Sequence, residues 1–224
     1  MKKTTIIGLL VAVIVFSEIV TPFAASWWLD SSLNKVMPAR QHSVSARSLP
    51  GFALWLGRFD KVRAVSEDAQ IDGLKIRESR VTIDDARIDV AELIGNNRIN
   101  IKLVRNLEVM MKLNEKDLAD YLAIKVKEVK NPTVKILADK IEVRGDIDLG
   151  LIKLAVAVDG RIVGDGQSIR FRSDRLEVKN AGGINFAGLF AEIPLLDLTQ
   201  LPFKVGVRKI FTEPGVVIIH ADNR

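Results

Sequence analysis

Hydrophobic and polar residues alternate with a period of two along most of the chain beyond residue 41, which is typical of β-strands that bury one face. The alternation is regular over Leu74–Ile83, and then Ile88 and Val90 fall on the opposite parity. We interpret the change at Asp84-Asp85 as a bulge or a tight turn. Leu154–Val158 is apolar at every position. The pattern therefore predicts a sheet with one face covered by helices and the other by a second sheet or a ligand.

The same pattern gives the order of the expected elements. Strands are predicted at 44–48, 62–69, 74–83, 99–113, 134–138, 140–148, 151–163, 168–178, 204–211 and 215–221. Short helices are predicted at 50–57, 186–191 and 198–201, and a longer helix follows Asn114, which can cap it. Turns or breaks are expected at 96–97, 131–132, 164–166 and 213–215. The fold class is therefore α+β, with long, mostly antiparallel strands, a few short helices and no internal domain linker.

Residues 1–29 have a different pattern and are expected to be an N-terminal membrane anchor or signal sequence. After Lys2 and Lys3, the stretch Thr4–Ser26 is mostly apolar and would be roughly 34 Å long as a helix, enough to cross a bilayer core of about 30 Å. Cleavage before Ser26 would put the bulky Phe23 where a signal peptide has a small residue. We favour a retained anchor, with residues 30–224 as one extracytoplasmic domain. The alternative is a secreted or periplasmic protein after cleavage.

Trp27-Trp28 allows two interpretations. The pair could form an aromatic belt at the outer face of the membrane. Alternatively, a helix begins with Pro22 at its first position, runs to about Met37 and packs these rings on the domain. Both arrangements are compatible with one long helix.

The formal net charge is +5, and nearly all of the basic excess lies in residues 30–63, next to the predicted anchor. Lys35, Arg40, Arg58 and Lys61 in this segment could attract anionic head groups at a membrane surface. Ordinary positive charge flanking an anchor explains the same pattern equally well. Nucleic acid is a poor partner for an exported chain with 6% aromatic residues. The sequence does not tell which proteins, if any, are partners.

Catalytic chemistry has little support in the sequence. The chain has no cysteine, which excludes disulfides, thiolate nucleophiles and cysteine-ligated metals. His42 and His220 are far apart and lack the spacing of metal ligands, so structural or surface roles are favoured. No nucleophile elbow, phosphate loop or dinucleotide motif is present. We expect no catalytic residue, no cofactor and no metal, although a pair of distant carboxylates for hydrolysis stays open.

Four acidic residues that lie close together in the sequence could coordinate calcium. They are Asp84, Asp85, Asp89 and Glu92. The group lacks the ligand order of a calcium-binding loop, and Arg80 and Arg87 are expected to neutralise it. Metal binding is therefore not predicted.

Large apolar residues gather in two short segments. The first contains Phe52, Leu54, Trp55, Leu56 and Phe59, and the second contains Phe186, Leu189 and Phe190, followed by Ile193, Leu195 and Leu196. Short helices of this kind either complete a core, which is the simpler alternative, or line a lipid-sized cavity. Since a helix turns by about 100° per residue, Leu54, Trp55 and Leu56 cannot all face the core. We expect Trp55 or Phe59 to face a lipid cavity or the bilayer.

The order of these segments resembles the bacterial LmeA-like phospholipid-binding family. The resemblance covers roughly residues 22–221. It rests on a helix from Pro22, a short helix within Ser48–Gly57, a strand pair around Asp72–Leu74, a helix start at Leu113–Leu118 and the ending Leu195–Phe203 before two strands. It implies an extracytoplasmic domain that binds phospholipid in an apolar groove under a curved sheet, with no catalytic residue to transfer. A looser, architectural likeness links the chain to tubular lipid-binding domains.

The sequence and the resemblance together lead us to expect a membrane-anchored, extracytoplasmic protein that handles envelope lipid. Burial of acyl chains would supply the affinity, at about 0.8 kcal/mol for each CH₂ group removed from water. Two other classes stay open: a non-catalytic structural or adaptor domain of the envelope with a filled core, and an envelope hydrolase.

Overall fold

The computed structural model describes the chain except residues 1–2, 97, 149–152, 179–186 and 202. In the N-terminal helix, side chains are described from Glu18 onward, apart from residues 19 and 36. Strands make up about half of the described residues, far above the usual 20–25% of a globular protein. Every described strand pair is antiparallel. The predicted α+β class with long antiparallel strands is therefore confirmed.

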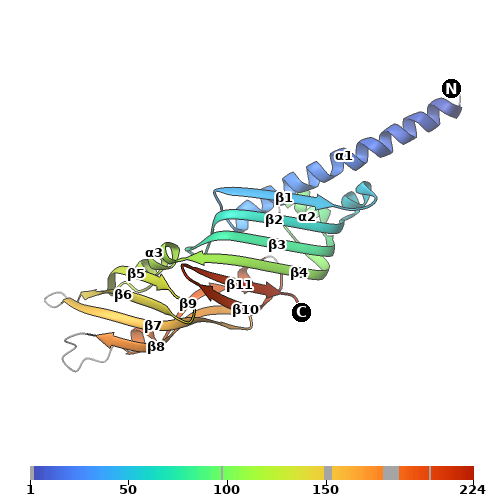
Figure 1. Cartoon of the computed structure of the whole chain (residues 1–224). Coiled ribbons are helices and arrows are strands. Elements are labelled where there is room, and N and C mark those ends of the chain that lie inside the picture. The colour runs from blue at the N-terminus through green and yellow to red at the C-terminus, as the bar shows by residue number, and fades with distance from the viewer. Residues whose placement is uncertain (1–2, 97, 149–152, 179–186, 202) are drawn as a thin grey trace.

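Helix α1 (Lys3–Val36) is continuous and projects beyond the sheets at its N-terminal end (Figure 1). Its C-terminal half packs on the domain through a buried stripe with a spacing of about one turn, formed by Ala25, Leu29, Leu33 and the following Met37. Pro22 lies inside this helix and not at its first position, so the predicted helix start was wrong. The apolar run before Pro22 and the docked turns after it keep the chain helical on both sides.

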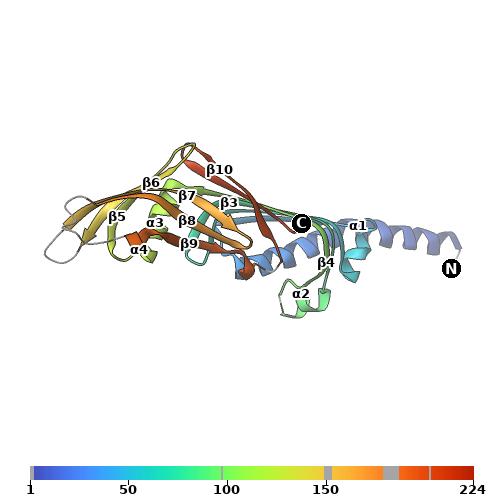
Figure 2. The same ribbon diagram turned by 90° about the horizontal axis from the view of Figure 1, so that it is seen from below.

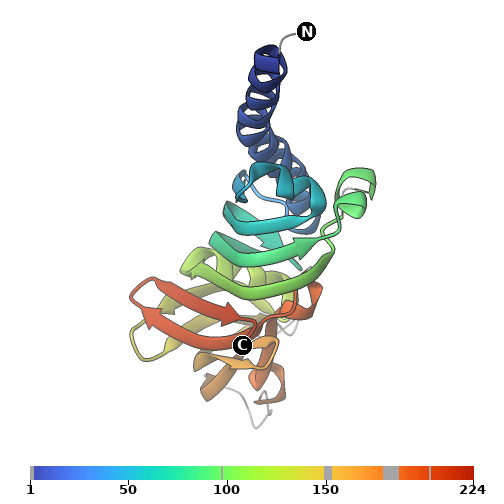
Figure 3. The same cartoon turned by 90° about the vertical axis from the view of Figure 1, so that its right-hand side faces the viewer.

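The next segments form a six-stranded sheet with the order β1-β2-β3-β4-β11-β10. Its strands are β1 (Gln41–Arg47), β2 (Arg58–Ile71), β3 (Leu74–Ile88), β4 (Ile101–Asn114), β10 (Gly206–Glu213) and β11 (Val216–Asp222). The 3₁₀ helix η1 (Gly51–Leu56) connects β1 to β2, and helix α2 (Val90–Asn96) connects β3 to β4. The sheet is strongly curled, like half a barrel, and Figure 2 shows its strands bending towards α2. Figure 3 shows that α1 leaves the domain at the β1 edge.

A second sheet has five strands in the order β5-β6-β7-β8-β9. These strands are β5 (Val129–Ile136), β6 (Ile141–Asp148), β7 (Lys153–Asp165), β8 (Ser168–Val178) and β9 (Glu192–Asp197). Helix α3 (Glu115–Lys125) joins the two sheets, α4 (Ala187–Phe190) precedes β9, and the 3₁₀ turn η2 (Leu198–Gln200) follows it. The predicted cap of α3 is confirmed, because the Asp117 amide donates to Asn114 Oδ1 at 2.7 Å.

The two sheets are joined by hydrogen bonds as well as by the chain. The Tyr121 hydroxyl in α3 donates to the Pro194 carbonyl in β9 at 2.8 Å, and burial raises the pKa of Tyr121 to about 12. The Thr212 hydroxyl in β10 donates to the carbonyl of Ala138, just after β5, at 2.7 Å. Strand β10 also contacts β7 and β8. The inner faces of the sheets therefore enclose one continuous core.

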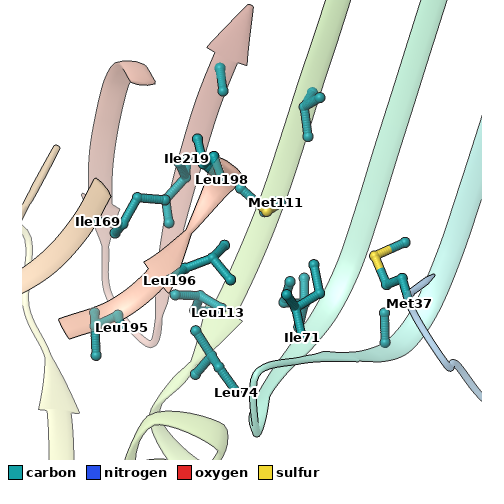
Figure 4. Close-up of a cluster of buried hydrophobic side chains, with 14 of the residues drawn as sticks. Met37, Ile71, Leu74, Met111, Leu113, Ile169, Leu195, Leu196, Leu198 and Ile219 are labelled. Carbon is teal, nitrogen blue, oxygen red and sulfur yellow. The ribbon is translucent and has the colours of Figure 1, made fainter. Parts of the chain in front are cut away.

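The centre of this core lies where the sheets meet. Figure 4 shows Met111 and Leu113 of β4 and Ile219 of β11 facing Ile169 of β8 and Leu196 of β9. All five side chains are buried. The second sheet thus covers the inner face of the first sheet at this end of the molecule, and α1 covers the same face at the other end. The prediction that helices and a second sheet cover opposite faces was wrong, because both lie on the inner face.

The predicted irregularity at Asp84-Asp85 lies inside β3 and is not a tight turn. It is not a bulge with an extra residue either, because Lys61 lies opposite Asp84 and Phe59 lies opposite Ala86 with no change of register. Ile83 and Ala86 are both buried although three positions apart, and Asp85 has a φ of 53°. In the paired rows of β2, Val62 and Phe59 are likewise both buried, so the two strands change their buried parity at the same place.

Three elements differ from the sequence analysis. Helix α2 and strand β9 were not predicted, because α2 has only 7 residues and β9 contains a proline. Asn131-Pro132 does not end a unit but lies within β5, where the pairing with β6 shifts between Lys130 and Thr133 and Asn131 takes a φ of 49°. A bulge allows a proline in a strand because no ladder hydrogen bond is required there.

Candidate lipid-binding site and membrane-facing surface

The short helix η1 is fixed on α1 by polar contacts. The Gly51 amide donates to Glu18 Oε1 at 2.6 Å, and Trp55 Nε1 donates to Thr21 Oγ1 at 3.1 Å. Gly57 ends η1 in the left-handed region with a φ of 77°. The first two turns of docked α1 therefore determine where η1 and its apolar side chains lie.

Strand β1 is fixed on the same helix. The amide of Ala46 in β1 donates to Ser26 Oγ at 3.0 Å, and this hydroxyl donates to the Pro22 carbonyl at 2.6 Å. A cleft of about 600 Å³ runs beside this contact between α1 and β1, and Phe23, Val44 and Leu49 are among its lining residues. Glu18 and Pro22, which are unusual in a spanning helix, thus take part in docking the helix on the domain.

Exposed apolar side chains concentrate where α1 leaves the domain. Among the described residues, seven of the eleven large exposed hydrophobic side chains fall within residues 20–56. We call this set the apolar collar: Val20, Phe23, Trp27, Leu49, Phe52, Trp55 and Leu56. Because water disfavours a concentration of exposed apolar surface, a collar of this kind marks a surface that contacts a partner or a membrane.

The predicted lipid-binding residues divide between this collar and the core. Phe52, Trp55 and Leu56 are exposed by 50%, 46% and 79%, whereas Leu54, Phe59 and Phe190 are buried. Phe186 lies outside the described residues, and so does the side chain of Leu189. The prediction that one of Leu54, Trp55 and Leu56 faces away from the core is confirmed.

Trp55 takes the outward position that we expected of it or Phe59, since Phe59 is only 1% exposed. Its ring also contacts Trp28 edge-on, with 5.6 Å between ring centroids. Trp28 packs against the core, as the second interpretation predicts, while Trp27 is exposed. An aromatic belt at the membrane stays a prediction. Whether these residues bind lipid stays a prediction.

Three of the four predicted head-group cations are engaged in ion pairs. Arg40 lies 3.2 Å from both Glu67 and Asp68. Arg58 Nε lies 3.5 Å from Asp60, and Lys61 Nζ lies 3.3 Å from Asp84. Lys35, the fourth cation, is exposed at the end of α1 and has no ion pair within the described part of the chain. The four side chains thus differ in the charge that they offer to a ligand.

Lys35 lines a cleft with a volume of about 1040 Å³. The cleft lies between the end of α1, the α2–β4 connection, the β7–β8 turn and the segment after η2. Its other basic residues are Arg98, Lys102 and Lys204, and its one carboxylate is that of Glu92. The lining is therefore basic.

One of these cations is already paired. Lys102 Nζ lies 3.0 Å from Asp89 Oδ2, and this contact holds the pKa of Asp89 below its usual range. Asp89 Oδ1 also accepts from the Ala91 and Glu92 amides at the start of α2, at 3.1 and 3.3 Å. Both carboxylate oxygens of Asp89 thus have partners, one at the start of α2 and the other at Lys102.

The cleft also has apolar walls. Ile99, Ile101, Leu103 and Val104 form one wall, and Leu201 and Phe203 form another. Leu201 and Phe203 also line a void of about 10 Å³ between α1 and the inner face of β2, β3 and β4. These two side chains therefore separate the open cleft from the apolar layer under the curled sheet.

Sequence reasoning missed the cleft. Arg98, Lys102 and Lys204 were not singled out, because Lys204 lies more than a hundred residues beyond the other two in the chain. A partial signal exists in Arg98–Val104, where basic residues alternate with large apolar ones at the start of a strand. Nothing in the sequence places Lys204 beside them.

The residues considered for catalysis have structural contacts. His42 Nδ1 lies 2.7 Å from Ser66 Oγ, and His220 packs edge-on against Phe211. Asp84 and Asp85 pair with Lys61 and Arg105, not with the predicted Arg80 and Arg87.

Arg80 instead pairs with Glu78, its neighbour on the exposed face of β3. Among the described residues, no group of histidine or acidic side chains could hold a metal ion.

The predicted anchor, Thr4–Ser26, falls largely on α1 residues whose side chains lie outside the described part. Within the described part of the chain, no helix is both long and apolar enough to cross a membrane.

A family model described as LmeA-like phospholipid-binding matches residues 20–222. The chain belongs to this family. The match to the LmeA-like family begins one residue before Thr21, the first buried side chain of α1 among the described residues, so the docked half of α1 is part of the family's domain. It also includes the apolar collar and the basic cleft. Comparison with curated proteins gives no match, and comparison with solved structures gives none.

Proposed function

We propose that this LmeA-like protein binds phospholipid, without catalysis, at the extracytoplasmic face of the cell membrane. In this proposal, the N-terminal half of α1 is an anchor, and Lys2 and Lys3 stay on the cytoplasmic side. The domain of residues 30–224 handles lipid of the cell envelope.

The apolar collar is the observation that carries the proposal. Its residues belong to α1, to η1 and to Leu49 just before η1, and η1 is fixed on the part of α1 that leaves the domain, so an anchored α1 would hold these side chains at the bilayer surface. Tryptophan favours the boundary between apolar and polar surroundings, and Trp27 and Trp55 are both in the collar. The family to which the chain belongs supports phospholipid as the ligand.

One observation favours the alternative of an adaptor domain with a filled core. The two voids that adjoin α1 beneath η1 and beneath the curled sheet have volumes of only about 10 Å³ each. Lipid binding therefore requires either one of the open clefts or a displacement of side chains around these voids. Lipid capture by the purified protein separates the two functions.

The position of the collar relative to the membrane can be measured by the fluorescence of its tryptophans. The chain has 3 tryptophans, and all of them, Trp27, Trp28 and Trp55, lie in or against the collar. We expect brominated phospholipids to quench the fluorescence of the full chain in vesicles, most strongly with bromine near the head groups. Quenching no greater than that of a soluble tryptophan compound would contradict the membrane-facing role.

Two double variants test whether membrane contact depends on exposed apolar groups in the collar or on exposed apolar groups anywhere on the domain. Phe52→Ser with Leu56→Ser changes the collar, and Ile124→Ser with Phe211→Ser removes exposed apolar groups on α3 and β10. The collar variant should lose much of the quenching, because each exposed ring or isobutyl group contributes about 1.5–3 kcal/mol when it leaves water. The control variant should behave like the unchanged chain.

A further inference from the structure

We infer that the basic cleft binds the phosphate of a net-anionic phospholipid head group. This inference rests on the proposed function and names the ligand class of one site. The cleft is defined by Lys35, Arg98, Lys102 and Lys204, together with the apolar wall that includes Phe203.

The charges of the cleft are available to a ligand. Lys35, Arg98 and Lys204 form no ion pair within the described part of the chain, unlike most cations on the strands. Cations brought together without counter-ions repel one another, and a phosphate relieves that repulsion. Arg98 adds a planar group that suits two phosphate oxygens.

The negative groups near the cleft do not cancel this charge. Glu92 accepts from Asn96 Nδ2 at 3.0 Å, and Asp89 is held by Lys102 and by the start of α2. Three cations therefore face one lining carboxylate, and Lys102 is neutralised by Asp89. An anionic ligand is favoured over a cationic or neutral one.

The apolar walls indicate that the phosphate belongs to a lipid. A soluble phosphate compound gains nothing from Ile101, Leu103, Leu201 and Phe203, which occupy the same cleft as the cations. An amphiphile matches both parts of the cleft, because its head group contacts the basic residues and its acyl chains contact the apolar wall. The volume of about 1040 Å³ lies at the upper end of the range for small-molecule pockets.

The route of the acyl chains follows from the same wall. Leu201 and Phe203 are only half-buried, and behind them lies the apolar layer lined by Leu33, Val81 and Met111. If these two side chains swing aside, acyl chains enter that layer while the head group stays on the cations. The cleft would then be the entrance to the space under the curled sheet.

The experiment compares two triple variants with the full chain in detergent. Lys35→Gln with Arg98→Gln and Lys204→Gln removes the unpaired cations, and Arg40→Gln with Arg58→Gln and Lys61→Gln removes the same charge from ion-paired positions. Each protein is incubated with micelles that contain equal amounts of phosphatidylglycerol and phosphatidylcholine. After re-isolation, mass spectrometry gives the ratio of the two bound lipids, and thermal unfolding verifies that each variant is folded.

We expect the full chain and the ion-paired variant to enrich phosphatidylglycerol about tenfold, which corresponds to about 1.4 kcal/mol. The cleft variant should bind both lipids about equally. Enrichment that persists in the cleft variant, or is lost equally in both variants, would overturn the inference while leaving phospholipid binding intact. Absence of any bound phospholipid on the full chain would overturn the proposed function itself. Displacement of the lipid by an equimolar amount of glycerol phosphate would show a site for soluble phosphates, which also contradicts the inference.

Discussion

The indole nitrogen of Trp55 donates a hydrogen bond of 3.1 Å to the hydroxyl of Thr21, and this contact couples η1 to the turn of α1 that leaves the domain. The two residues are 34 positions apart in the chain. Because Trp55 is also 46% exposed, it both holds η1 on α1 and forms part of the apolar collar. Substitutions of this residue can therefore distinguish its contribution to the stability of the fold from its contact with the membrane.

Trp55→Phe should keep most of the ring while removing the hydrogen bond, which lowers the free energy of unfolding by about 0.5–1.5 kcal/mol. Trp55→Ala should cost somewhat more, about 1–2.5 kcal/mol, but less than the 3–5 kcal/mol of a fully buried aromatic residue. Thermal and urea unfolding measure both values. A loss of 3–5 kcal/mol in Trp55→Ala would assign the ring to the core and remove it from the collar.

Gly57 and Gly73 both have positive φ angles, 77° and 84°, but differ in surroundings. A Cβ on Gly57 would overlap the Ile88 carbonyl, whereas a Cβ on Gly73 would meet no atom within 4 Å. Gly73→Ala should therefore cost only the backbone strain, about 1–2 kcal/mol. Gly57→Ala should cost about 1–3 kcal/mol more, because the Ile88 backbone must move and η1 with it. Equal losses of unfolding free energy in the two variants would contradict the close packing of η1 on β3.

Asp117 should make stability depend on pH in an unusual direction. Burial raises the pKa of the Asp117 carboxyl above its usual range, and one carboxylate oxygen has no hydrogen-bond partner. The folded protein then binds this proton more tightly than the unfolded chain, so the contribution of Asp117 to stability falls as the pH rises from about 4 through the raised pKa.

Asp117→Asn removes the unfavourable charge and keeps the backbone amide that donates to Asn114. The variant should be more stable than the unchanged chain at pH 7, by about 1 kcal/mol, and nearly equal to it at pH 3. Melting temperatures of the two proteins between pH 3 and pH 7 test the sign. A variant that is less stable at pH 7 would show that the carboxylate is stabilised in the folded state.

The sequence analysis was most reliable where local chemistry decides the structure. The Asn114 cap and the irregularity at Asp84-Asp85 could be recognised because a cap residue and a change of parity are visible in a few neighbouring positions. Pro22 and Asn131-Pro132 were misinterpreted, because a proline usually ends an element and only tertiary packing or a bulge allows it to continue.

The candidate site was less predictable for a different reason. Leu54, Trp55 and Leu56 are adjacent in sequence, yet only the position of α1 determines which of them is buried. Lys35, Arg98 and Lys204 belong to three distant segments, and their shared cleft is a product of the topology. Charge counted along the chain pointed instead to Arg40, Arg58 and Lys61, whose carboxylate partners come from neighbouring strand positions.

The most direct measurement of the central claim is the lipid content of the full chain purified from membranes in a mild detergent. Mass spectrometry of the intact protein and of its extracted lipid gives the number and class of bound molecules. Phospholipid binding predicts about one phospholipid per chain that survives delipidating washes, and a matched single-span membrane protein should retain none. A full chain that retains no more phospholipid than this control would contradict the account and favour an adaptor domain with a filled core.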